Sequence, residues 1–391
     1  MRRPRSYVTL GTIISLLICL GPAGNAENLT NRRPKVLIFV YDAGETLGLL
    51  PIAPLLEIEK IDVRWVPLTP WSLRVIKQEH KSYVEPPDLD NLPQIKDREA
   101  EGNIDFWLRL IAEEKPDLVI VGLVSRVQEQ LAQELKVLGI RTVGFYDAFD
   151  PTTRDTIVWR VANQVDTVWV PTETIQRNLN DLGLRKVKVM GQPSLETWYR
   201  LAGNVKSSSL YTRLQIPRGK KILLFAGQYG EGYKEILEAF LRAAHIELDR
   251  QKDLYLVLSY HPKTGGELER EAIQKYSHPR LMLMPQGLST AELATVSSAV
   301  ITWRSTVGIQ AAFLGKPVLY FNFNLHDYTN NLIEKGLAFA STPSTFSTTL
   351  QLALTRRNDS LANRMRLAKL GYVINADRKI ASEIVRLVRR D

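Results

Sequence analysis

Three acidic residues stand where strand-like runs give way to turns, the usual place for a general base in an α/β protein. Asp42 and Glu45 follow the apolar run at 35–41, and Asp147 follows the run at 142–145. A carboxylate near an acceptor hydroxyl can take its proton as the oxygen attacks an electrophile. Acidic side chains after strands also cap helices and form turns. The positions therefore make Asp42, Glu45 and Asp147 candidate catalytic residues, with capping and turn formation as the structural alternative.

A second group of polar residues lies in three loops of the C-terminal half. A Gly-rich loop follows the apolar run at 221–226, a His-Pro-Lys turn follows 254–259, and a Ser-Thr pair follows 299–302. Unpaired backbone N–H groups at a helix start, together with basic side chains, favour phosphate binding. Capping is again the alternative, but the occurrence of three such loops favours a ligand site. The predicted binding residues are Gln228, Tyr229, His261, Lys263, Ser305, Thr306, Gly308 and Gln310.

The acidic residues and the predicted phosphate-binding residues must be positioned by strands and helices that alternate along the sequence. Short runs rich in Val, Ile, Leu and Phe alternate with amphipathic helical stretches, a pattern typical of parallel sheets with helices on both faces. The alternation restarts at Lys221, after a small, polar stretch at 203–209 that predicts a connector. We therefore expect an α/β protein with two Rossmann-like, doubly wound domains at 35–200 and 216–375, followed by a C-terminal helix at 376–391.

Composition narrows the function classes. The chain has 391 residues, enough for two domains, and its 45% hydrophobic and 24% charged residues are typical of globular proteins. The single cysteine, Cys19, lies in the N-terminal apolar run, which excludes disulfides and cysteine-based catalysis or zinc sites in the rest of the chain. The net charge of +9 is not concentrated in a basic run. We therefore expect a phosphorylated ligand, with a membrane surface as a further partner, and no nucleic acid.

The first 26 residues have the order of a targeting segment. Three arginines precede an apolar run at 7–20, and small residues lead up to Ala26. This order predicts a signal peptide cleaved after Ala26 and an exported protein, periplasmic or lumenal. An uncleaved membrane anchor is the alternative, although the run is shorter than the roughly 20 residues of a usual span.

Several of these segments resemble one fold family. The stretch STVGIQAAFLGKPVLYF at 305–321, the YHPK turn at 260–263 and the segment 165–196 are similar to GT-B proteins, among them UDP-N-acetylglucosamine 2-epimerase, lipid-A-disaccharide synthase and the capsule and teichoic-acid polymer transferases. The resemblance extends over most of 35–390. It implies a nucleotide-sugar site in the C-terminal domain, an acceptor site in the N-terminal domain, and metal-independent chemistry without a cofactor. These families usually have Glu where Gln310 stands, which leaves the identity of the nucleotide open.

These features together predict a glycosyltransferase that moves a sugar from a nucleotide-sugar to a glycan or lipid-linked acceptor of the cell envelope. The diphosphate is expected at Ser305–Gly308 with His261 and Lys263, in a cleft between the domains, and one of the three acidic residues is expected to act as base. Because nucleotide-sugars are made in the cytoplasm, export conflicts with this activity. An exported, non-catalytic GT-B-like module that binds a glycan is therefore the alternative. A periplasmic solute-binding protein is less favoured, because the chain crosses between its halves only once or twice.

Overall fold

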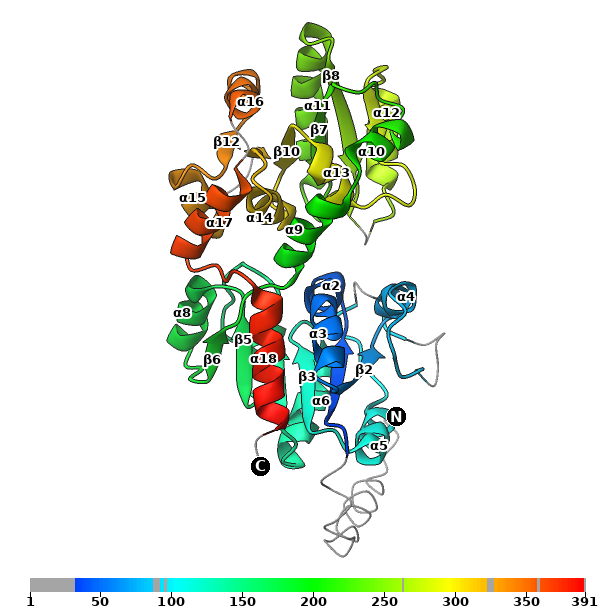
Figure 1. Ribbon diagram of the computed structural model, residues 1–391, viewed down its shortest axis with the longest axis vertical. Coiled ribbons are helices and arrows are strands. Elements are labelled where there is room, and N and C mark those ends of the chain that lie inside the picture. The colour runs from blue at the N-terminus through cyan, green and yellow to red at the C-terminus, as the bar shows by residue number, and fades with distance from the viewer. Residues whose placement is uncertain are drawn as a thin grey trace, which may run out of the picture.

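The computed structural model describes residues 32–86, 92–94, 97–261, 264–321, 327–356 and 359–389. These residues form two α/β domains that lie end to end in Figure 1. Each domain is built around a six-stranded sheet in which all described strand pairs are parallel. The predicted α/β class with two doubly wound sheets is thus confirmed, while the segment 1–26 lies outside the described residues.

The first sheet belongs to the N-terminal domain and has the strand order β2-β1-β3-β4-β5-β6. Its strands are rich in branched and aromatic apolar residues because both faces of a parallel sheet are covered. Along β1, Leu37 and Phe39 belong to the core on one face, whereas Val36 and Ile38 belong to the core on the other. The strands are β1 Lys35–Val40, β2 Asp62–Pro67, β3 Leu118–Gly122, β4 Thr142–Phe145, β5 Thr167–Val170 and β6 Val187–Val189.

Helices cover both faces of this sheet, and one of them comes from the C-terminal end of the chain. Helix α18 (Ala376–Val388) buries Ile380, Ala381 and Ile384 in the core of the first domain; Figure 1 shows it in red beside the blue and green elements. The other elements on this sheet are α2 Ala43–Leu49, the 3-10 helix η2 Leu50–Ile52, α3 Ala53–Ile58, α4 Pro70–Gln78, α5 Ile104–Glu114, α6 Arg126–Val137, α7 Ile157–Ala162 and α8 Glu173–Asp181.

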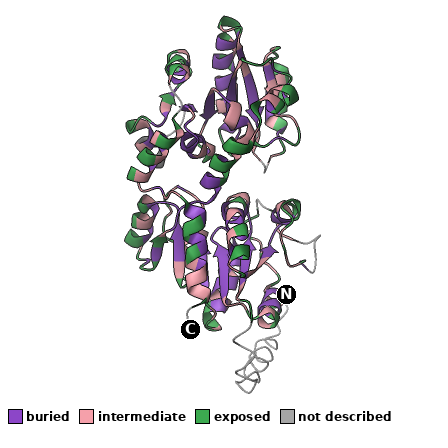
Figure 2. Cartoon of the chain, viewed as in Figure 1, coloured by how far each residue is buried: buried purple, intermediate pink, exposed green. Residues whose placement is uncertain are grey.

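The second sheet has the order β12-β11-β10-β7-β8-β9. Because β10, β7 and β8 are neighbours and parallel, the three loops predicted to bind the ligand all leave the same edge of the sheet. Figure 2 shows the strands of both sheets as largely buried. The strands are β7 Lys221–Ala226, β8 Leu254–Ser259, β9 Leu281–Leu283, β10 Ala299–Thr302, β11 Val318–Phe321 and β12 Phe339–Ser341. The helices are α9 Ser194–Asn204, α10 Ser207–Arg213, α11 Tyr233–Arg250, α12 Glu267–Lys275, α13 Thr290–Val296, α14 Val307–Phe313, α15 Asp327–Glu334, α16 Phe346–Thr355 and α17 Ser360–Lys369.

The chain leaves the first domain just before α9 and returns to it between α17 and α18, and a buried ion pair joins these two passages. The Glu196 carboxylate accepts hydrogen bonds from the Arg364 guanidinium, at 3.1 Å, and from the backbone N–H of Asn375. The guanidinium of Arg364 also lies over the rings of Tyr199 and Phe313, 4.0 and 4.8 Å from their centroids. Since the two charged side chains are only 4% and 12% exposed, this ion pair fixes the crossing point.

Candidate active site

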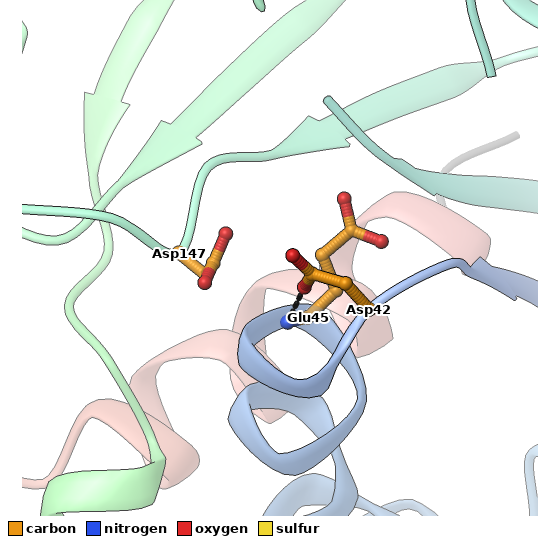
Figure 3. A group of neighbouring side chains, drawn as sticks. All are labelled: Asp42, Glu45 and Asp147. Carbon is orange, nitrogen blue, oxygen red and sulfur yellow. Dashed lines mark hydrogen bonds between the residues drawn. The ribbon is translucent and has the colours of Figure 1, made fainter. Parts of the chain in front are cut away.

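The three acidic residues singled out in the N-terminal half meet at the carboxyl edge of the first sheet. Asp42 follows β1, Glu45 lies in the first turn of α2, and Asp147 follows β4. One carboxylate oxygen from each lies within 4.8 Å of the others, and Figure 3 shows the three side chains around the start of α2. Asp42, Glu45 and Asp147 are called the acidic trio below.

Asp42 fulfils the structural alternative, because it caps α2. Its Oδ1 accepts hydrogen bonds from the backbone N–H groups of Gly44 and Glu45, at 3.0 and 3.3 Å. Its Oδ2 forms an ion pair with Arg98 at 3.3 Å. A carboxylate at this position satisfies N–H groups that have no partner within the helix. Asp42 therefore orients the start of α2 and is less suited to receive a proton.

Glu45 is the deepest member of the trio, with its side chain fully buried. Its Oε2 accepts hydrogen bonds from the backbone N–H of Tyr41, at 2.9 Å, and from the Gln128 side-chain amide, at 2.8 Å. The carboxyl lies against Gly122 at the end of β3, where a Cβ would come within 1.8 Å of it. Burial, followed by the charges of Asp42 and Asp147, raises the pKa of the Glu45 carboxyl well above its ordinary value.

Asp147 is the least buried member of the trio. Its carboxylate lies against Gly44, where a Cβ would meet an oxygen at 1.6 Å, so a side chain at residue 44 would displace the Asp147 carboxylate. Its backbone carbonyl accepts a 2.9 Å hydrogen bond from the side-chain amide of Gln192. Because it is held in place yet partly open to solvent, Asp147 is the member best placed to contact a substrate.

The loops after β7 and β8 bring together two of the residues predicted in the C-terminal half. The rings of Tyr229 and His261 lie 4.4 Å apart, centroid to centroid, and Tyr229 is exposed. Gln228, in the same loop as Tyr229, is half-buried. Lys263 lies outside the described residues.

The loop after β10 and the start of α14 hold the remaining predicted binding residues. Thr306 is exposed and makes no side-chain capping bond, whereas the Ser305 hydroxyl accepts a hydrogen bond from the Val307 N–H at 3.2 Å. Gly308 is buried against Tyr320 of β11. Gln310 donates a hydrogen bond from its side-chain amide to the Ser194 hydroxyl, at 3.4 Å.

A short segment before and at the start of α9 joins the two groups of predicted site residues. Gln192 binds the carbonyl of Asp147 in the first domain, and two residues later Ser194 binds Gln310 of the second. Gln192 itself is buried. Neither Gln192 nor Ser194 was predicted from the sequence. The only signal there was Gly191-Gln192-Pro193, which ends a strand, and nothing in it indicates a partner in either domain.

Two open depressions lie at the opposite, amino-terminal edge of the first sheet. One is lined by residues that include Arg32, Lys35 and Trp65, and the other by residues that include Arg141 and Lys186. No predicted site residue lines either of them, so they belong to a different face from the candidate active site. Within the described part of the chain, no helix combines the length and apolar character needed to cross a bilayer.

Comparison with known structures identifies the fold. The chain is similar to the S. aureus MnaA–UDP complex (19% identity, TM-score 0.68, covering 90% of this chain and 96% of that one). It is also similar to a putative UDP-N-acetylglucosamine 2-epimerase from Listeria monocytogenes (17%, 0.71, 92% and 98%) and to a glycosyltransferase from Rickettsia africae (12%, 0.63, 92% and 100%). At these identities the likeness concerns the fold alone, and it confirms the predicted resemblance to GT-B proteins and the 2-epimerase.

Comparison of sequences points to a more specific relationship. Teichoic acid glycerol-phosphate primase of Bacillus spizizenii is 25% identical over 142 residues, which are 35% of this chain and 34% of that protein. The match thus spans about a third of the curated relative's length. The family described as CDP-glycerol:poly(glycerophosphate) glycerophosphotransferase matches residues 125–345, which include Asp147, His261 and the start of α14 but not Asp42 or Glu45. Because that match covers more than half of the chain, the protein belongs to the CDP-glycerol:poly(glycerophosphate) glycerophosphotransferase family.

Proposed function

We propose that this protein transfers glycerol phosphate from CDP-glycerol to a hydroxyl group of an acceptor during synthesis of a teichoic-acid type envelope polymer. The family match over residues 125–345 carries the proposal, and the likeness to a teichoic acid glycerol-phosphate primase supports it. The donor predicted from the sequence was a sugar, but one fold serves many nucleotide-linked donors. Transfer from a polyol phosphate donor breaks a different bond from transfer of a sugar out of a nucleotide-sugar.

Transfer of glycerol phosphate from a cytidine diphosphate is a displacement at phosphorus. The acceptor oxygen forms a bond to the phosphorus that carries glycerol, the bond from that phosphorus to the bridging oxygen breaks, and CMP leaves. The acceptor hydroxyl loses its proton, and negative charge develops on CMP. Such a reaction depends on positioning and on electrostatic stabilisation of the phosphates. It therefore calls for a base beside the acceptor and for hydrogen-bond donors beside the diphosphate.

The donor diphosphate is assigned to the carboxyl edge of the second sheet. Ligands of open α/β sheets bind outside the carboxyl ends of the strands, and the loops after β7, β8 and β10 leave adjacent strands there. Tyr229 and His261 supply a ring pair on one side, and Ser305 and Thr306 supply hydroxyl and N–H groups on the other. Lys263, from the same turn as His261, is assigned to the phosphates on its charge alone.

The general base is assigned to Asp147. Asp42 is used in capping α2 and Glu45 is fully buried, whereas Asp147 is partly open. The Gln192–Ser194 segment connects the Asp147 loop with Gln310 of the second domain, which supports a base on the side of the first domain that faces the donor loops. In this assignment the acceptor proton passes to the Asp147 carboxylate as the oxygen attacks phosphorus.

A nucleotide-linked donor also bears on the N-terminal segment. Because CDP-linked donors, like nucleotide-sugars, are expected in the cytoplasm, the proposed activity favours the anchor alternative for residues 1–26, with both domains on the cytoplasmic side. A reporter fused after residue 391 together with the mass of the N-terminal peptide tests this. An intact Met1 and a cytoplasmic reporter support the anchor, whereas a new N-terminus at Glu27 supports export.

Calorimetry and a turnover assay test the proposed function. The full-length protein is titrated with CDP-glycerol, CDP and a panel of UDP-sugars, and CMP release is followed with an acceptor that ends in glycerol phosphate. We expect CDP-glycerol to bind and to release CMP only when the acceptor is present. Asp147→Asn is expected to lower the turnover by roughly 100-fold or more without changing the Kd for CDP-glycerol. Asp181→Asn, at the exposed end of α8, is the control.

The same assays separate the alternatives. Binding of a UDP-sugar but not of CDP-glycerol would return the function to the sugar transfer predicted from sequence. If no nucleotide binds and glycan fragments do, the protein is a non-catalytic glycan-binding module. If CDP-glycerol is turned over and Asp147→Asn retains full activity, the transfer stands and the assignment of the base is wrong.

A further inference from the structure

The Glu45 carboxyl is the one member of the acidic trio that neither caps a helix nor has a task in the proposed reaction. Its side chain is fully buried, and oxygens of two other carboxylates lie within 4.8 Å. An isolated ionised carboxylate is costly to bury, and a cluster of three fully charged carboxylates adds mutual repulsion. The position of the Glu45 proton therefore decides the charge of the whole site.

The two oxygens of Glu45 have different surroundings. Oε2 accepts from the backbone N–H of Tyr41 and from the Gln128 amide. The orientation of that amide is fixed, because the Gln128 oxygen accepts from the N–H groups of Val124 and Ser125 and lies 3.0 Å from the Ser125 hydroxyl. Both groups facing Oε2 are thus donors, so Oε2 carries no hydrogen.

Oε1 has the opposite environment. It is buried and has no hydrogen-bond partner among the described residues, and it occupies the space that a side chain at Gly122 would fill. An unpaired, buried carboxylate oxygen is expensive, whereas a carboxylic acid O–H carries no charge to desolvate. The asymmetry between the two oxygens places the hydrogen on Oε1.

Among the residues that the structure describes, no positive charge pairs with Glu45 directly. Arg98 is paired with Asp42 of the trio, and its side chain is 44% exposed. On α6, Glu129 is held by Arg126 and Arg160. In the described part of the chain, the titratable and charged groups on the elements around Glu45 include Tyr41 and Asp42 after β1, Arg98 in the loop before α5, Glu129 on α6, and Tyr146 and Asp147 after β4.

We propose that Glu45 is held as a protonated carboxylic acid at neutral pH, so that the acidic trio carries two negative charges instead of three. Where it concerns catalysis, this inference rests on the proposed function. Loss of the proton adds a third charge beside Asp147 and repels the phosphates of donor and acceptor. Glu45 is accordingly a positioning residue that keeps the site accessible to anionic substrates.

The sign of the pH effect on folding follows from burial. Burial first, and then Asp42 and Asp147, raise the pKa of the folded Glu45 carboxyl. The folded state therefore keeps a proton that the unfolded state releases above pH about 4.3. The corresponding stability is complete below that pH and is lost as the pH rises toward the folded pKa. Glutamine at residue 45 has the shape of the protonated acid and no proton to lose.

Chemical unfolding of the wild type and of Glu45→Gln between pH 5 and 8 tests the proposal. We expect the folding equilibrium constant of Glu45→Gln, divided by that of the wild type, to rise at least tenfold over this range, and by no more than tenfold per pH unit. Glu57→Gln, on the exposed side of α3, supplies the baseline. A ratio that stays constant with pH for Glu45→Gln means that Glu45 is ionised in the folded protein and overturns the proposal.

Two further measurements test for a bound cation and for the proton itself. Mg²⁺ or Mn²⁺ is added to both proteins, and a rise in the unfolding midpoint of the wild type that Glu45→Gln lacks makes the trio a cation site and overturns the proposal. If Glu45→Gln does not fold, the infrared band of a protonated carboxylic acid is sought at pH 7 in the Glu269→Gln variant. That background is chosen because Glu269 is a second buried carboxyl whose pKa burial raises. Presence of the band supports the proposal and its absence overturns it.

The unfolding experiments need neither donor nor acceptor, so their outcome is independent of the proposed function. The catalytic part is tested by the pH profile of kcat/KM for CMP release. Wild type is expected to lose activity at high pH as Glu45 ionises, and Glu45→Gln is expected to lack that loss. An alkaline loss of equal size in both proteins overturns the catalytic role.

Discussion

Gly308 of α14 lies so close to Tyr320 of β11 that a Cβ on residue 308 would be 2.3 Å from the tyrosine hydroxyl oxygen. Tyr320 is fully buried and cannot move aside freely. We predict that Gly308→Ala lowers the free energy of unfolding by about 1–3 kcal/mol, as overpacking in a core does. It should also weaken binding of CDP, because the displaced turn contains Ser305 and Thr306. Urea unfolding and calorimetric titration measure the two effects.

A glycine elsewhere supplies the control for this substitution. Nothing lies within 4 Å of a Cβ built on Gly203, near the end of α9. Gly203→Ala is expected to stabilise the protein slightly, by about 0.5–1 kcal/mol, because alanine restricts the unfolded chain. Equal stability of the two variants would mean that Tyr320 accommodates the extra carbon.

Substitution of Gln192 is predicted to lower the activity without changing the affinity for the donor. Its amide holds the Asp147 carbonyl at 2.9 Å, so Gln192→Met frees the loop that carries the proposed base. We expect kcat/KM to fall about tenfold, which corresponds to the loss of one hydrogen bond, while the Kd for CDP-glycerol is unchanged. Gln176→Met is the matched control, since Gln176 makes a 2.8 Å bond of the same kind to the Val187 carbonyl, away from the site.

Loss of the Glu196–Arg364 ion pair, at the crossing between the domains, is predicted to lower the stability strongly. Glu196→Ala leaves the buried Arg364 guanidinium without its carboxylate, and we expect a loss of about 3–5 kcal/mol in the free energy of unfolding. The exposed pair Arg389–Glu59, with side chains 51% and 44% exposed, gives the comparison. Glu59→Ala is expected to cost less than about 1 kcal/mol, and similar losses for the two variants would contradict the importance assigned to the crossing.

Glu383 on α18 predicts a loss of stability in acid. Its carboxylate binds Arg386 on the same helix and Lys188 on β6, and these contacts, Arg386 first, lower the pKa of Glu383 to about 2. Because the folded pKa is depressed, the stabilisation is present above the unfolded pKa of about 4.3 and disappears as pH falls toward 2. Glu383→Gln should therefore cost about 1 kcal/mol at pH 7, after screening by solvent, and progressively less toward pH 2. Urea unfolding across this range would show a constant difference if the contacts were not formed.

The strands of the first sheet and the central strands of the second could be predicted from sequence, but the edge strands of the second sheet could not. The runs at 221–226 and 254–259 have the same bounds as β7 and β8, because strands buried on both faces are continuous apolar runs. Strands β9 and β12 have three residues each, too few to show a pattern. The stretch 203–209, predicted as a connector, contains the end of α9 and the start of α10, since packing in the tertiary structure overrides weak local propensity.

The candidate site was predictable to the extent that it follows from sheet topology. Asp42 and Asp147 meet because β1 and β4 are both neighbours of β3, and carboxyl ends of parallel strands share one edge. The contact between Glu45 and Gln128 joins residues 83 positions apart through one side-chain amide. Gln192 likewise depends on the path of the chain between domains. Such contacts have no periodicity in the sequence from which they could be predicted.

The return of α18 to the first domain has a consequence for how the protein is made. Ile380, Ala381 and Ile384 complete a core whose other members come from the beginning of the chain. During synthesis, the strands of the first sheet are made before this helix. The N-terminal domain therefore cannot complete its core, and keeps apolar surface exposed, until the second domain has been synthesised. Contacts between such distant parts of a chain slow folding and expose intermediates to aggregation. The last thirteen residues of regular structure thus decide when the first domain reaches its native state.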